Sequence, residues 1–287
     1  MIYYNRKAVN SAKKEVFAVM VYTKEDIFRQ LKEMNAPQDK VVLMHSSLRA
    51  VGSVEGGAEG LLRILISYFT EKGGLFCVPA HTWHNFGKEI TLDMASDDTC
   101  LGAFSKVAIG SGLGFRSENP SHSLVVFGDR ERVMKFVEDE PCIATPTAAD
   151  SCHGKLCAWG GYVLLVGVAH NRNTYLHSVA EMLRLPNRMA DKPIPTCIRR
   201  ENGELVHREL TLYRTDYVSD ISLRFPKYET AFRYHKCIRD GFIGDAPTQL
   251  CDAAGMKETV ALIWQNSGGE DPLRGESPIP QKWYCSL

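Results

Sequence analysis

Residues 161–181, GYVLLVGVAHNRNTYLHSVAE, constrain the fold of this chain more than any other stretch. The segment begins with an apolar, β-branched run bounded by glycines, which is typical of a strand buried on both faces. Asn173 and Thr174 then favour the start of a helix. On that helix Thr174, His177 and Glu181 would share one face. Polar side chains just past the carboxyl end of a buried strand mark the place where open α/β sheets carry their sites.

The charge balance and the cysteine content restrict which partners and which cellular location we expect for this chain. The chain has 287 residues, and its 34 basic residues balance its 34 acidic residues. Proteins that bind nucleic acid or anionic membranes usually carry a basic surplus, so we expect neither partner. No uninterrupted apolar run reaches the ~18 residues of a transmembrane helix. The 9 cysteines are scattered without a CxxC pair, which predicts reduced thiols in a cytoplasmic protein and no thiolate zinc site.

The length is sufficient for one large α/β domain. Residues 1–19 match the rest poorly and form an uncertain extension, residues 20–275 form the single domain, and residues 276–287 form a tail. Met20 precedes the first helix-like segment, and we hypothesise that the functional protein begins near it. Loss of solubility or activity on deletion of residues 1–19 would contradict this hypothesis. The sequence specifies no oligomeric state.

The hydrophobic pattern predicts an α/β fold in which helices flank a mixed central sheet. Strand patterns occupy residues 40–44, 75–79 and 124–128, and helical patterns occupy residues 23–34, 58–68, 101–109, 130–138, 228–239 and 256–266. The Asn202-Gly203 pair predicts a hairpin between residues 194–200 and 204–213. Residues 242–246 form a short extended piece. We expect this C-terminal region of hairpin and helix to pack on the same body.

The first predicted strand leads through a polar turn and a glycine-bearing loop into a helix. The turn and loop contain His45, Ser46, Ser47, Arg49, Gly52, Gly56 and Gly57. Backbone N–H groups at a helix N-terminus attract anions and serine hydroxyls add donors, so the stretch is a candidate phosphate cradle. It fits neither the GxGxxG nor the P-loop pattern. An ordinary strand–helix connection is the alternative, and the local pattern alone favours it.

A second polar stretch follows the strand at residues 75–79. His81 and His84 have a spacing that metal ligands use, but no third ligand follows nearby. Trp83 and Phe86 in the same stretch are more typical of a loop that walls a ligand pocket. We therefore predict a pocket wall and no metal here.

A third polar cluster lies at residues 116–123, just before a predicted strand. It contains Arg116, Ser121, His122 and Ser123. Such a set could hold a phosphate or a thioester. It could equally belong to a loop whose side chains bond their own backbone, and both interpretations stay open.

Four stretches in this order resemble the aminoglycoside N3-acetyltransferase family, which is distinct from the GNAT acetyltransferases. They are HSSLRAVGSVEGG at residues 45–57, CVPAHTWHNF at 77–86, RSENPSHS at 116–123 and the segment 161–181. The hairpin region and the IGDA segment at residues 243–246 also fit. No single motif is decisive, but their conjunction is specific.

The resemblance implies acetyl-CoA as the donor, a small-molecule amine as the acceptor, and a role of the antibiotic-resistance type. It implies that the coenzyme contacts Ser46, Ser47, Gly52, Gly56, Gly57, Ser121, His122 and Ser123. The family's Asn-Thr-x-x-His motif is met by Asn173, Thr174 and His177, so His177 falls where the family's catalytic base lies.

The chain departs from the family's pattern in three places. Ala180 stands where the family has a carboxylate, and Glu181 follows one residue later. Asn119 replaces a frequent histidine, and SCHG at residues 151–154 replaces a Ser-Pro-x-Gly step. Carboxylates that could meet a polycationic acceptor are Glu89, Asp93, Asp97 and Asp98.

These residues predict direct acetyl transfer. His177 would take the amine's proton, since an unperturbed imidazole titrates near ~6.5. Glu181 would orient the imidazole or contact the acceptor, and the Thr174 hydroxyl would donate to the oxyanion. Alternatives are transfer to a non-antibiotic small amine, a non-catalytic CoA-binding protein, a Cys152–His153 nucleophile pair, and a His177 that is only a core residue.

Overall fold

The computed structural model describes residues 20–285. The hypothesis that the functional protein begins near Met20 concerns residues 1–19, which lie outside this range. None of the helices in residues 20–285 has the length and apolar character to cross a bilayer.

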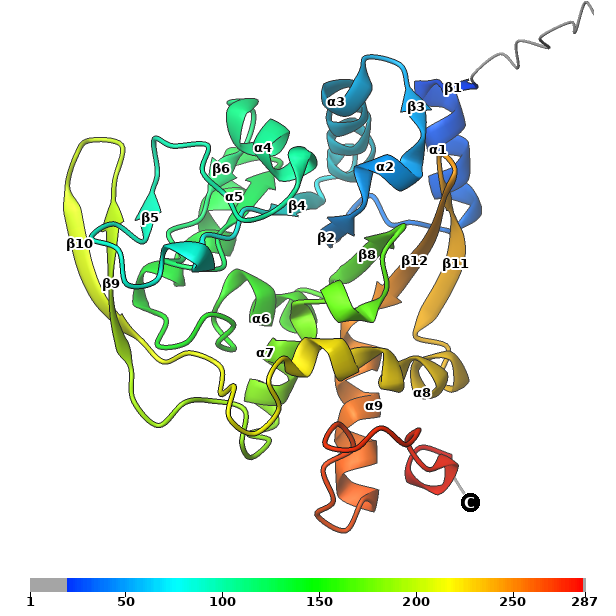
Figure 1. Cartoon of the computed structure of the whole chain (residues 1–287). Helices are drawn as coiled ribbons and strands as arrows, with labels where there is room; N and C mark the ends of the chain where they lie inside the picture. The colour runs from blue at the N-terminus through cyan, green and yellow to red at the C-terminus, as the bar shows by residue number, and fades with distance from the viewer. Residues whose placement is uncertain (1–19, 286–287) are drawn as a thin grey trace, which may run out of the picture.

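A seven-stranded mixed sheet forms the centre of the molecule (Figure 1). Its strands, in spatial order, are β11 (Ile238–Ile243), β12 (Ala246–Asp252), β8 (Tyr162–Val166), β2 (Val41–Ser46), β4 (Leu75–Pro79), β7 (Leu124–Phe127) and β6 (Phe115–Arg116). The three central strands β8, β2 and β4 run parallel, and the outer strands pair antiparallel. The predicted mixed α/β fold is therefore confirmed.

Both faces of this sheet are buried, as the unbroken apolar runs predicted. On β2, Val41 and Leu43 belong to one core cluster, whereas Val42 and Met44 belong to the other. Successive side chains on a strand point to opposite faces, so an apolar run places residues in both clusters. This explains why β2 and β8 read as continuous hydrophobic runs.

Helices cover the two faces of the sheet (Figure 1). One face packs against α1 (Lys24–Glu33), α3 (Gly57–Thr70) and α4 (Ala103–Gly110), and the other packs against α5 (Arg130–Val137), α6 (Cys152–Ala158), α7 (Tyr175–Met182) and α9 (Ala253–Asn266). Thr23 begins α1 with a capping box, in which its side chain and that of Asp26 bond each other's backbone. Helices α1, α3, α4, α5 and α9 overlap helices predicted from the sequence, and α7 begins directly after Thr174, at the predicted helix start.

The predicted hairpin is confirmed, and it forms a sheet of its own. Strands β9 (Ile194–Arg199) and β10 (Leu205–Leu210) pair antiparallel, and β9 also pairs with the short β5 (Leu92–Asp93). Figure 1 shows this sheet as an arm beside the main body. A two-stranded parallel pair, β1 (Val21–Tyr22) with β3 (Ser53–Val54), completes the strands of the described region.

The C-terminal part of the main sheet was predicted incorrectly. The helix expected at residues 228–239 ends early, since α8 spans Glu229–Tyr234 and Ile238 already begins β11. Strand β12 was missed because it contains Pro247 and polar residues, which lower its local strand propensity. Its pairing with β8 supplies the backbone hydrogen bonds that override this propensity. The segment assigned to the tail contributes Ile279, Trp283 and Tyr284 to the core.

Four histidines gather at one end of the sheet: His45, His81, His122 and His153 are all at least nine-tenths buried. The ring of His81 lies 4.5 Å from that of His122 and 5.7 Å from that of His153. Burial lowers the pKa of His45 and of His122 to about 3 and lowers the pKa of the other two well below the usual range. These side chains are therefore neutral imidazoles in the folded protein at pH 7.

We predict that acid unfolds this protein by protonating the histidines. Imidazoles of the unfolded chain bind protons near pH ~6.5 whereas the buried ones do not, so the free energy of unfolding falls as pH drops below that value. Burial raises the pKa of Glu140 and of Glu181, which offsets part of this loss at lower pH. Urea unfolding measured between pH 7.5 and pH 5 tests this prediction.

His153 isolates the effect, since neither of its ring nitrogens has a hydrogen-bond partner among the described residues. His153→Leu should reduce the proton uptake on unfolding by about one proton. His207→Leu is the matched control, because it removes an exposed histidine and leaves the buried ones in place. A stability that does not vary with pH in the wild-type protein would contradict the prediction.

Candidate active site

A cavity of about 1010 Å³ opens at the carboxyl ends of the parallel strands β2, β4 and β8. Strand β2 lies between the other two, so the chain leaves it toward β4 and later returns to its other side as β8. Ligands of open α/β sheets bind at such a point of reversal, where the loops part. The sequence prediction of a site beyond the carboxyl end of β8 agrees with this position.

A tight turn leads from β8 to the predicted helix. Gly167 adopts a φ of +62°, and a Cβ there would lie 2.5 Å from the Cβ of Ala50. Only glycine fits both conditions. The turn continues into a short 3-10 helix, His170–Arg172, whose backbone hydrogen bonds lead into α7. The chain thereby brings the first turn of α7 to the cavity wall.

His177 lines the cavity from α7, packed between two aromatic rings. Its imidazole stacks on Tyr213, with centroids 4.0 Å apart and planes 16° apart. The Phe225 ring meets it edge-on, with a centroid distance of 4.9 Å. Burial, together with the charge of Arg188, lowers the pKa of His177 to about 3. The imidazole is thus a neutral base at pH 7, whereas the sequence alone suggested an unperturbed one.

Glu181 does not hydrogen-bond His177 among the described residues. Its carboxylate instead accepts hydrogen bonds from the hydroxyls of Thr145 and Thr147, the latter at 2.5 Å. The Thr147 hydroxyl also lies 2.8 Å from the Tyr213 hydroxyl. The carboxylate thus reaches the imidazole indirectly, through Thr147 and the tyrosine that stacks on His177.

Thr174 stands at the N-cap position of α7 and lines the cavity. Its side chain forms no capping hydrogen bond with the helix. A hydroxyl that does not cap its own helix can donate to a ligand in the cavity. The predicted oxyanion donor is therefore placed beside the predicted base.

The predicted coenzyme residues divide into two groups. His45, Ser46, Ser47 and His122 line the cavity. Arg49, Gly52, Gly56, Gly57, Arg116, Ser121 and Ser123 do not. Coenzyme contacts remain a prediction for both groups, and the position of the first group in the cavity lining is compatible with them.

Two glycines of the candidate phosphate cradle, Gly52 and Gly56, are required by the local backbone structure. Gly52, with a φ of +80°, leaves room for the Asp245 carboxylate, which would lie 2.3 Å from a Cβ at this position. Gly56 adopts a left-handed conformation just before α3. The strand–helix connection therefore accounts for both residues without a ligand.

The polar cluster at residues 116–123 mostly bonds its own surroundings. The buried guanidinium of Arg116 donates to the carbonyls of Ala80, Ser96 and Asp98. The Ser123 hydroxyl donates to the Ala80 carbonyl at 2.7 Å, and the Ser121 hydroxyl lies 2.8 Å from Nδ1 of His122. Of the two interpretations, the loop that bonds its own backbone describes Arg116 and Ser123.

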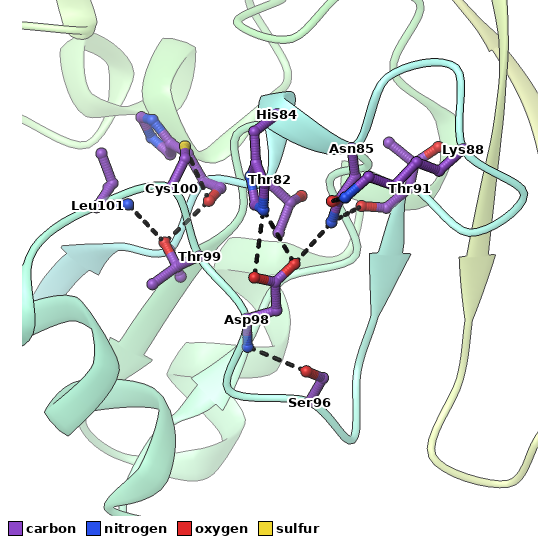
Figure 2. Close-up of polar contacts among 12 residues, drawn as sticks. Thr82, His84, Asn85, Lys88, Thr91, Ser96, Asp98, Thr99, Cys100 and Leu101 are labelled. Carbon is purple, nitrogen blue, oxygen red and sulfur yellow. Dashed lines mark hydrogen bonds and ion pairs between the residues drawn. The ribbon is translucent and has the colours of Figure 1, made fainter.

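The loop after β4 forms one wall of the cavity through Trp83 and Phe86, as their residue types predicted. Figure 2 shows how Asp98 holds this loop: its carboxylate lies 3.2 Å from Nε2 of His84 and accepts a 2.7 Å hydrogen bond from the Asn85 amide. His84 is turned to Asp98 and does not line the cavity. Within residues 20–285 no group of three or more His, Cys, Asp or Glu side chains could hold a metal ion.

The carboxylates expected for a polycationic acceptor lie elsewhere. None of Glu89, Asp93, Asp97 and Asp98 lines the cavity. Asp93 pairs with Arg199 at 3.0 Å, and Asp98 holds the wall loop (Figure 2). Among the described residues, one carboxylate lines the cavity, that of Asp220. Two arginines, Arg172 and Arg214, line it as well. Two acidic side chains outside the lining, Asp191 and Asp216, pair with Arg214.

The sequence reasoning missed Tyr213, Asp220 and Phe225. They follow the hairpin of β9 and β10, which returns the chain over the cavity, and no local spacing relates them to His177. The proposed Cys152–His153 nucleophile pair lies outside the cavity lining. Burial raises the pKa of the Cys152 thiol well above its usual range, which disfavours a thiolate.

Comparison with known proteins agrees with this architecture. The chain is 24% identical over 278 residues to aminoglycoside N(3)-acetyltransferase III of Salmonella, covering 88% of this chain and 95% of that relative. A histidine-to-alanine mutant of aminoglycoside acetyltransferase AAC(3)-IVa, solved in complex with a gentamicin, has a TM-score of 0.73 at 22% identity, covering 87% of this chain and 90% of that one. The binary complex of AAC-IIIb with CoASH has a TM-score of 0.70 at 20% identity, covering 86% and 97%.

The match to the family itself covers most of the chain and includes the elements that line the cavity. The family model described as aminoglycoside 3-N-acetyltransferase matches residues 43–263. These residues begin within β2, contain β4, β8 and α7, and end within α9. The chain therefore belongs to the aminoglycoside 3-N-acetyltransferase family.

Proposed function

We propose that this protein is an acetyl-CoA-dependent N-acetyltransferase, which moves the acetyl group of the CoA thioester to an amine of an aminoglycoside or a related amino sugar. The observation that carries the proposal is His177, a neutral imidazole that lines the cavity next to Thr174. Structures of two relatives, one with CoASH and one with a gentamicin, support the two ligand classes.

The cavity is large for a ligand pocket, which supports a site that takes both substrates. Its volume of about 1010 Å³ lies at the upper end of the ~300–1,000 Å³ typical of ligand pockets. Ser46 and Ser47 would bind the coenzyme at the end of β2. Holding both reactants together makes the reaction effectively unimolecular, which supplies much of the acceleration.

His177 would act on the amine during bond formation. An imidazole with a pKa of about 3 is too weak a base to hold a proton taken from a free ammonium group. The neutral amine attacks the thioester carbonyl, and its N–H becomes acidic as the N–C bond forms. His177 takes that proton, and the Thr174 hydroxyl donates a hydrogen bond to the oxyanion. As the carbonyl re-forms and the C–S bond breaks, the His177 imidazolium gives the proton to the coenzyme sulfur, which leaves as the thiol.

The charge of the cavity favours a second candidate, transfer to a small amine with few positive charges. The described lining holds one carboxylate, Asp220, and two arginines. A polycation would lack partners for most of its ammonium groups in such a cavity. The free thiols of all 9 cysteines support a cytoplasmic location for either candidate.

We predict that His177→Ala lowers the rate of thiol release from acetyl-CoA by ~10²–10⁴-fold, because the variant lacks the group that takes the amine's proton. His207→Ala, on the exposed face of β10, is the matched control and should keep the wild-type rate. Near-normal turnover of a folded His177→Ala protein would refute the role of His177.

The low pKa of His177 also predicts the pH dependence. The value of kcat/KM should rise with pH and level off near the pKa of the acceptor amine, since the imidazole is already neutral from about pH 4 upward. Initial rates between pH 5.5 and pH 9.5 with amines of different pKa test this. An inflection near pH 6.5 that is the same for all amines would show that His177 titrates normally.

A panel of acceptors separates the two candidate functions. Thiol release with a mono-amino sugar, a diamino sugar and gentamicin should show which class has the highest kcat/KM. Greater efficiency with gentamicin supports the aminoglycoside function, and at least ~10-fold greater efficiency with the mono-amine supports the second candidate. Tight CoA binding without thiol release for any amine would instead identify a non-catalytic CoA-binding protein and contradict both.

A further inference from the structure

We propose that Tyr213 is a positioning residue for His177: its ring fixes the plane of the imidazole and stabilises the imidazolium, and its hydroxyl joins that ring to Glu181 through Thr147. This inference rests on the proposed role of His177 as the base. It assigns a task to a residue that no local sequence pattern relates to the helix α7.

The stacking geometry supports the positioning role. The ring centroids of His177 and Tyr213 lie 4.0 Å apart, and the angle between the ring planes is 16°. The Phe225 ring packs against the imidazole as well, with an interplanar angle of 71°. Rotation about the last side-chain torsion of a histidine has only broad preferences, so packing must select the ring plane. Tyr213 and Phe225 together provide that packing, so the imidazole that lines the cavity keeps one plane.

The backbone of Tyr213 is itself held firmly. Tyr213 forms an antiparallel bridge with Met189, in the segment that follows α7. On either side, the Ala190 N–H donates to the Leu212 carbonyl and the Arg214 N–H donates to the Arg188 carbonyl, each at 2.8 Å. The segment that begins at the end of α7 thereby fixes the tyrosine that faces α7.

The electrostatics explain why the imidazole needs this partner. Burial disfavours a positive charge on His177, and the Arg188 guanidinium repels it further. Arg188 is already paired through two 2.7 Å hydrogen bonds with Asp271. The π face of a tyrosine attracts a cation stacked on it, and more strongly where water is excluded. Tyr213 therefore favours the imidazolium that forms as the proton arrives.

The direction of the hydrogen bonds follows from counting protons. Thr147 has a single hydroxyl proton, and it donates that proton to Glu181. The Tyr213 hydroxyl must then be the donor in its 2.8 Å contact with the Thr147 oxygen. Burial, with the charge of Glu181, raises the pKa of Tyr213 well above its usual range, so the phenol keeps this proton. The chain from Tyr213 to Glu181 is thus complete and directional.

This chain gives a physical role to the displaced carboxylate. Glu181 stands one residue later than the carboxylate of the family's pattern, and its oxygens are occupied by Thr145 and Thr147. Because the Thr147 hydroxyl donates its hydrogen bond to this carboxylate, the lone pairs of the Thr147 oxygen are oriented to accept the hydrogen bond from the Tyr213 hydroxyl. Glu181 would therefore act on His177 through the tyrosine ring that it helps to hold.

The test compares Tyr213→Leu, Tyr213→Phe and the control Tyr217→Leu in the full chain. Removal of the ring in Tyr213→Leu should lower kcat by ~10–100-fold, from lost stacking and misplacement of the base. The KM for acetyl-CoA should change by less than about twofold. Tyr213→Phe retains the ring and should restore kcat to within about fivefold of the wild type. Tyr217→Leu changes a tyrosine outside the cavity lining and should leave kcat unchanged.

A double-mutant cycle with His177→Ala separates positioning from a merely structural role. If Tyr213 acts through His177, Tyr213→Leu should cause no further loss in the His177→Ala background. An equal loss in both backgrounds, or a wild-type kcat in Tyr213→Leu, would overturn the inference while leaving the proposed base intact. An unchanged rate in His177→Ala alone would overturn the proposed base and the inference with it. Tyr213→Met, which fills the space with a flexible apolar chain, replaces Tyr213→Leu in the cycle if the leucine variant does not fold.

Discussion

The parallel pairing of β2 with β8 is the constraint on which the rest of the structure depends. It places the carboxyl ends of two buried strands side by side, at Ser46 and Val166. The end of β2 and the turn after it bring Ser46 and Ser47 to the cavity, and the turn after β8 brings Thr174 and His177 to it. The serines proposed to bind the donor and the proposed base therefore meet because two strands share a register, although more than 100 residues separate them in the chain.

The same arrangement determines the protonation state of the histidines at the site. A sheet covered by helices on both faces buries the groups at its edge, and burial keeps the histidines there neutral. A neutral imidazole can receive a proton at pH 7, but the surroundings that keep it neutral also oppose the charge it must carry during the reaction. The aromatic rings of Tyr213 and Phe225 would resolve this conflict in the proposed mechanism, because they hold the imidazole and the tyrosine face favours its charged form without adding a formal charge to the cavity.

Sequence patterns predicted those features of the structure that depend on neighbouring residues in the chain. The apolar run of β8, the start of α7 at Thr174 and the position of His177 on the cavity wall could all be read from neighbouring residues. Tyr213 could not, because its place depends on the return of the hairpin over the cavity. The cluster around Arg116 shows where a sequence pattern is ambiguous. The same residues could surround an arginine that binds phosphate or one that donates to three backbone carbonyls, as Arg116 does. Strand β12 was hidden because its stability comes from pairing with β8 and little from its own residues.

In the proposed reaction, one cavity at the end of β2 and β8 brings the thioester and the amine to His177. A crystal structure of the protein with CoA and an amino sugar bound tests it most directly. We expect the coenzyme sulfur to lie beside Thr174 and His177, with the acceptor nitrogen about 3–4 Å from the position of the thioester carbonyl carbon. A coenzyme bound with its sulfur outside this cavity, or an amine out of reach of the imidazole, would refute the proposed role of the cavity.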